Sequence, residues 1–194
     1  MARIPYRMLF FWIALGLSLG QFSQAGYLYA KALLAQQLIK DAWQQSLKNQ
    51  RQHKPWPWAD TWPVGRLKVP THHIDLYVLA GDSGRTLAFG PGHRFGTAMP
   101  GETGISLISA HRDTHFRFLK KLTSNDEILF QNIDGKWQHY RVTNSAVVHE
   151  SNTIADSPEN TLVLVTCYPF DAIIPSGPLR YVVFAQPRTD NKSV

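Results

Sequence analysis

Three side chains of this 194-residue sequence could together carry out acyl transfer: Cys167, His111 and Arg180. Cys167 is the only cysteine in the chain, so it cannot form an intrachain disulfide and its presence needs another reason. A thiolate is the attacking species in cysteine chemistry, and a neighbouring histidinium or arginine favours it. An imidazole can protonate a leaving amine, and a guanidinium can stabilise an oxyanion. The three residue types therefore indicate a nucleophile, an acid–base group and an oxyanion-binding cation.

These three residues stand at the ends of short apolar runs. Cys167 directly follows Leu162–Thr166, His111 closely follows Ile105–Ser109, and Arg180 lies at the start of Leu179–Ala185. Such β-branched runs between glycine and proline turns predict strands. Further runs predict strands at Arg66–Val69, Ile74–Leu79, Glu127–Gln131 and Trp137–Val148, and one helix at Thr114–Leu122. Many short strands with little helix predict a mainly β fold, a barrel or a sandwich, and not an alternating βα fold.

The N-terminal part of the chain has a membrane-like composition. Met8–Ala30 contains no charged residue, and at about 1.5 Å per residue it could cross a hydrocarbon core roughly 30 Å thick. Arg3 and Arg7 precede this run and predict a cytoplasmic N-terminus. Ser23 and Ala25 also fit the small-residue cleavage site of a signal peptide. An uncleaved signal anchor is the favoured interpretation, and a cleaved signal peptide is the alternative.

The composition changes three more times along the chain. Lys31–Gln50 has no glycine or proline and favours a helical stalk, which the prolines of Lys54–Pro63 end. The three tryptophans of that second segment predict that it packs along the following domain. We therefore expect four parts: a membrane segment (1–30), a helical stalk (31–54), a catalytic domain (55–187) and a C-terminal tail (188–194).

The charge pattern limits the partners. The net charge is +6, but the basic residues are scattered and do not alternate with aromatic residues as in a nucleic-acid surface. We therefore expect no nucleic-acid partner. Apolar residues make up 44% of the chain and charged residues 18%, a composition that excludes a disordered protein.

The residues around the three chemical groups resemble the sortase family. Leu164–Cys167 is similar to the last four positions of the sortase signature T-L-x-T-C, and Val163 replaces its first threonine. Gly101, Gly104, His111 and Arg112 match the sortase segment that leads to the catalytic histidine. Arg180 follows Cys167 by 13 residues, where the sortase arginine lies. The tryptophan–proline segment and the ending C-Y-P-F are most similar to class GN, the sortases of Gram-negative marine proteobacteria.

This resemblance implies a closed eight-stranded β-barrel with one or two short helices, preceded by an N-terminal membrane and stalk helix. It implies a cysteine transpeptidase in which Cys167, His111 and Arg180 are catalytic and Thr166 supports them or contacts the substrate. The substrate would be a secreted protein with a C-terminal sorting motif similar to L-P-x-T-G, and the acceptor an amine of peptidoglycan or of a protein. The enzyme would need no cofactor and no metal. It would lie in the inner membrane with its catalytic domain on the periplasmic side.

Several residues and functions have alternative interpretations. Asp113 could orient His111 as the acid of a triad, but we expect it to cap the helix beginning at Thr114. His111 and His115 stand four apart, yet a metal pair needs both on one helix and His111 ends a strand. We expect surface or turn positions for the remaining candidates, His72, His73, His93, His139 and His149. The alternative functions are a cysteine endopeptidase on the same fold and an inactive peptide-binding barrel.

Overall fold

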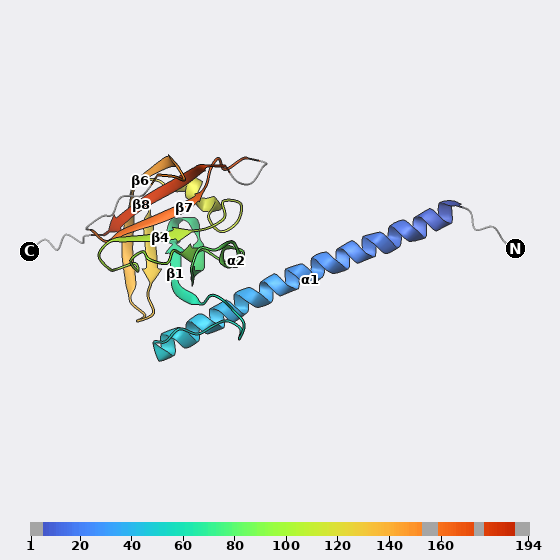
Figure 1. Ribbon diagram of the computed structural model, residues 1–194, viewed down its shortest axis with the longest axis horizontal. Coiled ribbons are helices and arrows are strands. Elements are labelled where there is room, and N and C mark those ends of the chain that lie inside the picture. The colour runs from blue at the N-terminus through green and yellow to red at the C-terminus, as the bar shows by residue number, and fades with distance from the viewer. Residues whose placement is uncertain (1–5, 153–158, 173–176, 189–194) are drawn as a thin grey trace, which may run out of the picture. The chain divides into compact units, whose positions relative to one another are not determined.

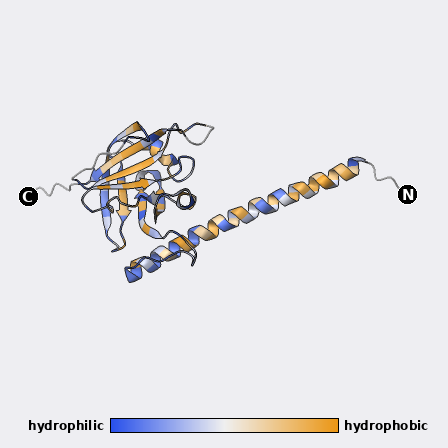
Figure 2. Cartoon of the chain, viewed as in Figure 1, coloured by the Kyte–Doolittle hydropathy of each residue, from blue (hydrophilic) through white to orange (hydrophobic). Residues whose placement is uncertain are grey.

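The computed structural model describes residues 6–152, 159–172 and 177–188, and the chain forms two units, 1–37 and 38–194. Everything described of the first unit belongs to helix α1 (Tyr6–Asn49). The large apolar side chains between Tyr6 and Leu34 are exposed. The hydropathy colouring of Figure 2 shows that the hydrophobic residues of the helix are concentrated in its N-terminal part. Among the described residues, α1 is the one helix whose length and composition allow it to cross a membrane; an N-terminal signal sequence meets the same criteria. Arg3, and the predicted tail apart from Arg188, lie outside the described residues.

The second unit begins with the last turns of α1. Ile39, Ala42, Trp43 and Ser46 share one face of the helix and are buried within this unit. The Ser46 hydroxyl accepts a 3.1 Å hydrogen bond from the His53 backbone N–H, so the chain folds back after the helix ends. The boundary between the units thus falls inside the segment expected to be a stalk, and the four predicted parts of the chain stay a prediction.

The tryptophan–proline segment packs on the domain through two of its three indoles. The rings of Trp56 and Phe89 lie 5.2 Å apart between centroids, and those of Trp62 and Phe95 lie 6.3 Å apart. The predicted packing is confirmed for these two tryptophans. It is wrong for Trp58, which is 82% exposed.

Eight strands form the barrel of the second unit (Figure 1). They are β1 (Pro63–Val69), β2 (Ile74–Ala80), β3 (Gly92–His93), β4 (Ile105–Ser109), β5 (Glu127–Gln131), β6 (Trp137–His149), β7 (Thr161–Cys167) and β8 (Leu179–Pro187). Neighbouring strands follow the order β1–β2–β3–β4–β7–β8–β6–β5, and β5 pairs with β1 to close the barrel. Every run expected to be a strand is one, and the closed eight-stranded barrel is confirmed. Sequence reasoning missed β3, because two residues are too few to display a period.

Side chains on one face of each strand fill the barrel. In β1 every second residue is buried, which is the period of a strand with one face in a core. Gly65 lies in this strand beneath the ring of Phe130, where an added Cβ would stand 2.1 Å from the ring's Cζ. The fully buried core residues include Leu67, Val78, Ile108, Ile128, Phe130, Tyr140, Leu162, Leu164 and Val183.

The expected helix at Thr114–Leu122 is wrong in type and extent. The structure has a short 3-10 helix there, η2 (Arg117–Lys121), which begins after Phe116 without a side-chain cap. Asp113 does not cap it, because its carboxylate contacts the Arg112 side chain. Two other short helices, η1 (Pro70–His72) and α2 (Gly84–Leu87), were not anticipated.

One histidine expected on the surface is buried. His93 lies in β3, and its Nε2 is 2.9 Å from the Ala98 carbonyl oxygen and 3.3 Å from the Thr97 hydroxyl. The expectation for His93 is wrong because it took the residue for part of a turn. Strand pairing on both sides covers it instead.

Candidate active site

Strand pairing brings the three predicted catalytic residues together. Strands β4 and β7 run parallel with Ser109 opposite Val165, and the Ala110 N–H donates to the Val165 carbonyl at 3.2 Å. His111 and Cys167 each come two residues after that pair. Strand β8 runs antiparallel to β7, and its Arg180 stands directly opposite Cys167. Three segments distant in the sequence therefore end at one edge of the barrel.

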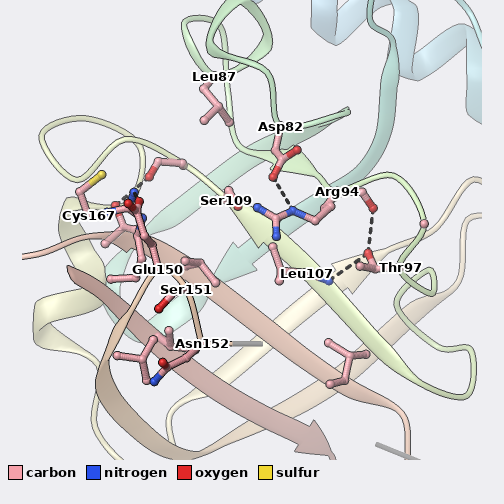
Figure 3. Close-up of a pocket in the computed structure, with 18 of the residues that line it drawn as sticks. Asp82, Leu87, Arg94, Thr97, Leu107, Ser109, Glu150, Ser151, Asn152 and Cys167 are labelled. Carbon is pink, nitrogen blue, oxygen red and sulfur yellow. Dashed lines mark hydrogen bonds and ion pairs between the residues drawn. The ribbon is translucent and has the colours of Figure 1, made fainter. Parts of the chain in front are cut away.

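Cys167, His111 and Arg180 all line one cavity of about 860 Å³. The outward side chains of β4, Ile105, Leu107 and Ser109, lie along it at every second position. Figure 3 shows Cys167 and Glu150 together at one side of this cavity, and Arg94 and Thr97 at the other. The cavity therefore extends along β4, and the end of β7 with Cys167 lies on the opposite side of it from Arg94 and Thr97.

The three residues differ in exposure. Cys167 is half-buried, His111 is exposed, and the Arg180 side chain is 26% exposed. Thr166 is 2% exposed, and its hydroxyl donates a 2.7 Å hydrogen bond to the Ala110 carbonyl. Since side chains alternate along a strand, Thr166 lies on the opposite face of β7 from Cys167. Its hydroxyl ties the end of β7 to the end of β4, and the residue is also among those that line the cavity.

The guanidinium of Arg180 is held by backbone and by a carboxylate. Its Nη1 donates to the Gly177 carbonyl at 2.5 Å and to the Leu179 carbonyl at 3.0 Å. Its Nη2 donates to Glu150 at 2.5 Å. These three acceptors hold the guanidinium in one position. Arg180 itself is the residue that stands opposite Cys167 in the sheet.

A family model described as the sortase domain matches residues 67–188 of the chain. This chain belongs to the sortase family. Sortase D of Bacillus subtilis (strain 168) is 28% identical over 125 residues, which make up 63% of this chain and 62% of the relative.

Solved sortases also share the fold. Sortase A from Corynebacterium diphtheriae superposes with a TM-score of 0.61 and 25% identity, over 71% of this chain and 66% of that one. Sortase C-1 from Actinomyces oris gives a TM-score of 0.58 and 28% identity, over 66% of this chain and 75% of that one. The matched part of this sortase spans 62% of the length of Sortase D and 66% of the length of the Corynebacterium diphtheriae chain.

Two charged residues of this sortase site were not predicted to contribute. Glu150, which contacts Arg180, lies just after β6 in a segment whose residues His149–Asn152 line the cavity. Arg112, next to His111, is buried and donates to backbone carbonyls after Cys167. Arg112 was named only as part of the family motif, with no role, and nothing in the sequence singled out Glu150. Sequence alone does not show which partner a charged side chain contacts. His149, expected only on the surface, also lines the cavity.

The contacts around His111 bear on two alternative interpretations, Asp113 as the acid of a triad and a metal pair of His111 and His115. Asp113 contacts Arg112, with 3.3 Å between its Oδ1 and Nε, so its recorded partner is the guanidinium and not an imidazole. Burial of His115, together with the charge of nearby His111, lowers the pKa of His115. Among the described residues no group of three or more His, Cys, Asp or Glu side chains could hold a metal ion.

Proposed function

We propose that this sortase is a membrane-anchored cysteine transpeptidase that cuts a sorting motif similar to L-P-x-T-G and transfers the acyl fragment to an amine. The observation that carries this proposal is the convergence of Cys167, His111 and Arg180 on one cavity from the ends of three strands. A thiol, an imidazole and a guanidinium can supply the nucleophile, the proton carrier and the oxyanion donor of acyl transfer through a thioester.

The first half-reaction is acylation. The Cys167 thiolate attacks the scissile carbonyl carbon, a C–S bond forms, and the carbonyl oxygen becomes an oxyanion that Arg180 stabilises. The protonated His111 gives its proton to the departing nitrogen as the C–N bond breaks. The products are a thioester on Cys167 and a free amine, with His111 left neutral.

The second half-reaction reverses the proton transfer. An acceptor amine attacks the thioester carbon, His111 takes the amine proton, and the C–S bond breaks to restore the thiolate. An amine that is held at the site has a large advantage in effective concentration over water. The same thioester attacked by water would make the protein a cysteine endopeptidase, so the competition between amine and water decides between the two functions.

The length of the chain segment that lines the cavity supports an extended peptide as substrate. From Ile105 to His111 the chain advances six residues, roughly 20 Å at about 3.3 Å per residue. A five-residue motif in extended conformation has a similar length. The apolar side chains of Ile105 and Leu107 suit the leucine and proline of such a motif, and Cys167 would then meet its carboxyl-terminal part.

The cellular setting is also proposed. We infer a class GN sortase anchored in the inner membrane, with its catalytic domain on the periplasmic side, where a secreted sorting-signal protein and an amine of peptidoglycan or protein meet. The length and composition of α1, with Arg3 and Arg7 before its apolar run, support this anchor. An intact N-terminus in the membrane fraction is expected; a soluble mature protein beginning at Gly26 would instead show a cleaved signal peptide.

The test of activity follows product masses. A peptide carrying an L-P-x-T-G-like motif is incubated with the full chain while an acceptor amine is titrated. The transfer product should increase with amine concentration, and the hydrolysed acid should decrease. If hydrolysis dominates with every amine, including peptidoglycan stem peptides, the protein is an endopeptidase. If Cys167 is not acylated at all, the catalytic proposal is wrong.

A further inference from the structure

Arg112, the residue after His111, is a buried cation with an unusual set of partners. Its side chain is only 4% exposed. Nη1 donates to the Pro169 carbonyl and Nη2 to the Ala172 carbonyl, both at 2.7 Å. Burying an arginine is unfavourable unless its donors are satisfied, so these bonds hold the side chain in one place.

These bonds join the two segments that carry the predicted acid–base group and nucleophile. Arg112 follows His111, and the carbonyls that it binds belong to the segment just after Cys167. On the other side, Ala110 precedes His111 and accepts a hydrogen bond from Thr166, which precedes Cys167. Both chain neighbours of His111 are therefore tied to the flanks of Cys167.

The imidazole of His111 has no comparable support of its own. His111 is exposed, and within residues 6–152, 159–172 and 177–188 the structure records no side-chain hydrogen bond to it. Its position relative to Cys167 therefore depends on the backbone on either side. Proton transfer requires heavy atoms within about 2.6–3.2 Å, and a displacement of about 1 Å can lower a rate about 10²-fold.

We propose that Arg112 is a positioning residue that acts through His111 by fixing the distance between the imidazole and Cys167. This inference rests on the proposed acyl transfer. A residue that only stabilises the fold would affect every step alike. Replacing a positioning residue should instead lower the rate of the step that needs the His111 proton. That step is the expulsion of the amine, in which the proton moves to nitrogen as the C–N bond breaks.

The experiment compares two leaving groups. One substrate is the sorting peptide, and the other is the same peptide with an ester in place of the scissile amide. An ester breaks its C–O bond to release an alcohol, a departure that needs less help from a proton donor than amine expulsion does. Arg112→Gln should lower the single-turnover acylation rate for the amide about 10²-fold and for the ester less than about fivefold. KM for both substrates should stay within about threefold of the wild-type value, because Arg112 is not among the residues that line the cavity.

Two further variants complete the series. Arg112→Lys keeps the positive charge but replaces the planar fork that reaches two carbonyls, so its amide rate should lie between wild type and Arg112→Gln. It is the milder change and carries the test if Arg112→Gln does not fold. Arg117→Gln is the matched control, since Arg117 is an exposed arginine five residues further on in η2, and both rates should equal those of wild type. Thermal unfolding confirms that each assayed variant is folded.

The outcomes separate the two proposals. A wild-type protein whose Cys167 is acylated by neither substrate overturns the proposed function and says nothing against Arg112 as a structural tie. An active wild type with equal losses for amide and ester in the folded Arg112 variants makes Arg112 a purely structural residue. Rates equal to those of the Arg117→Gln control would also overturn the inference. A loss confined to the amide establishes it.

Discussion

The two ends of strand β7 have opposite characters. Near its beginning, the buried Tyr140 hydroxyl accepts a hydrogen bond from the Gly101 N–H and donates one to the Asn160 carboxamide oxygen, both at 2.7 Å. At its end, Cys167 is half-buried and the neighbouring His111 is exposed. We call the first end of β7 the closed end, because the buried phenol there makes both of its hydrogen bonds. We call the second the open end, because Cys167 and His111 line a cavity there.

This difference separates stability from chemistry within one strand. A buried polar group without a partner costs roughly 1–3 kcal/mol, so the first end stabilises the fold only while its bonds are complete. The proposed nucleophile and proton carrier at the open end need room for a substrate, and their residues accordingly line a cavity. What holds that end in place is the layer behind it, where Thr166 and Arg112 bind backbone carbonyls.

The largest effect is expected at the open end. Cys167→Ala should lower acyl transfer by about 10⁴-fold or more, since removing a nucleophile removes the covalent route. The free energy of unfolding should change by less than about 1 kcal/mol, because a half-buried sulfur leaves little cavity. Peptide turnover and thermal unfolding measure both. Turnover within tenfold of wild type would contradict the assignment of the nucleophile.

The next effect concerns the cation opposite Cys167. Arg180→Ala should lower kcat by about 10²–10³-fold, the size of one lost oxyanion donor. Arg180→Lys should recover only part of this, because a point charge cannot keep the Gly177, Leu179 and Glu150 contacts of a planar guanidinium. Single-turnover acylation rates measure the effect. Near-normal rates in both variants would place Arg180 outside the reaction.

The closed end should respond in stability and not in activity. Tyr140→Phe removes the hydroxyl that joins Gly101 to Asn160, and should lower the free energy of unfolding by about 1–2 kcal/mol. Urea unfolding measures this, and kcat of the folded variant should equal that of wild type. A loss of kcat above about threefold would mean that the two ends of β7 are coupled.

The same variant has a pH signature. Burial raises the pKa of Tyr140, while its hydrogen bonds with Asn160 and Gly101 oppose this less strongly. A raised pKa in the folded state gives a stabilisation that is complete below the unfolded value of about 10 and is lost as pH rises above it. Wild type should therefore lose stability more steeply than Tyr140→Phe above about pH 10. Part of the slope should remain in the variant, because burial also raises the pKa of Tyr77. Equal slopes would contradict this account.

Sequence reasoning found the elements of this site for a simple physical reason. The runs at β4, β7 and β8 have the period and β-branched content of strands, and strand ends are where rigid backbone can present a side chain. Ile105–Ser109 and Glu127–Gln131 were predicted with the bounds that the structure has. The pairing of β4 with β7 was not predicted, because no local pattern specifies which strands are neighbours.

The supporting contacts were not predictable in the same way. Arg112 was recognised only as part of a motif, since nothing in its neighbours indicates that its side chain is buried against Pro169 and Ala172. The helix expected at Thr114–Leu122 failed for a related reason. Its apolar spacing was correct, and Phe118 and Leu122 are buried, but Asp113 contacts Arg112 and leaves no cap for the helix. Helix propensity alone therefore did not set this helix, because the expected capping carboxylate contacts the adjacent residue instead.

The smallest effect is expected from Glu150, which competes for the cation at the open end. Its carboxylate accepts a hydrogen bond from Nη2 of Arg180, so it competes with the proposed oxyanion for the same guanidinium. Glu150 is 52% exposed and Arg180 26%, so the pair is worth no more than about 1 kcal/mol. Removing the carboxylate charge frees the donor without removing the two backbone bonds that orient the guanidinium.

Glu150→Gln should therefore raise kcat/KM for acylation, by about two- to fivefold, which corresponds to that exposed pair. The ratio of kcat/KM between Glu150→Gln and wild type should decrease at high salt, because screening already weakens the Glu150–Arg180 attraction in wild type. Asp134→Asn is the matched control, an exposed carboxylate in the β5–β6 turn whose charge is remote from Cys167 in the sheet. A fall in kcat/KM would reverse the assignment: Glu150 would then be a residue that orients Arg180, and the open end of β7 would depend on a third fixed partner.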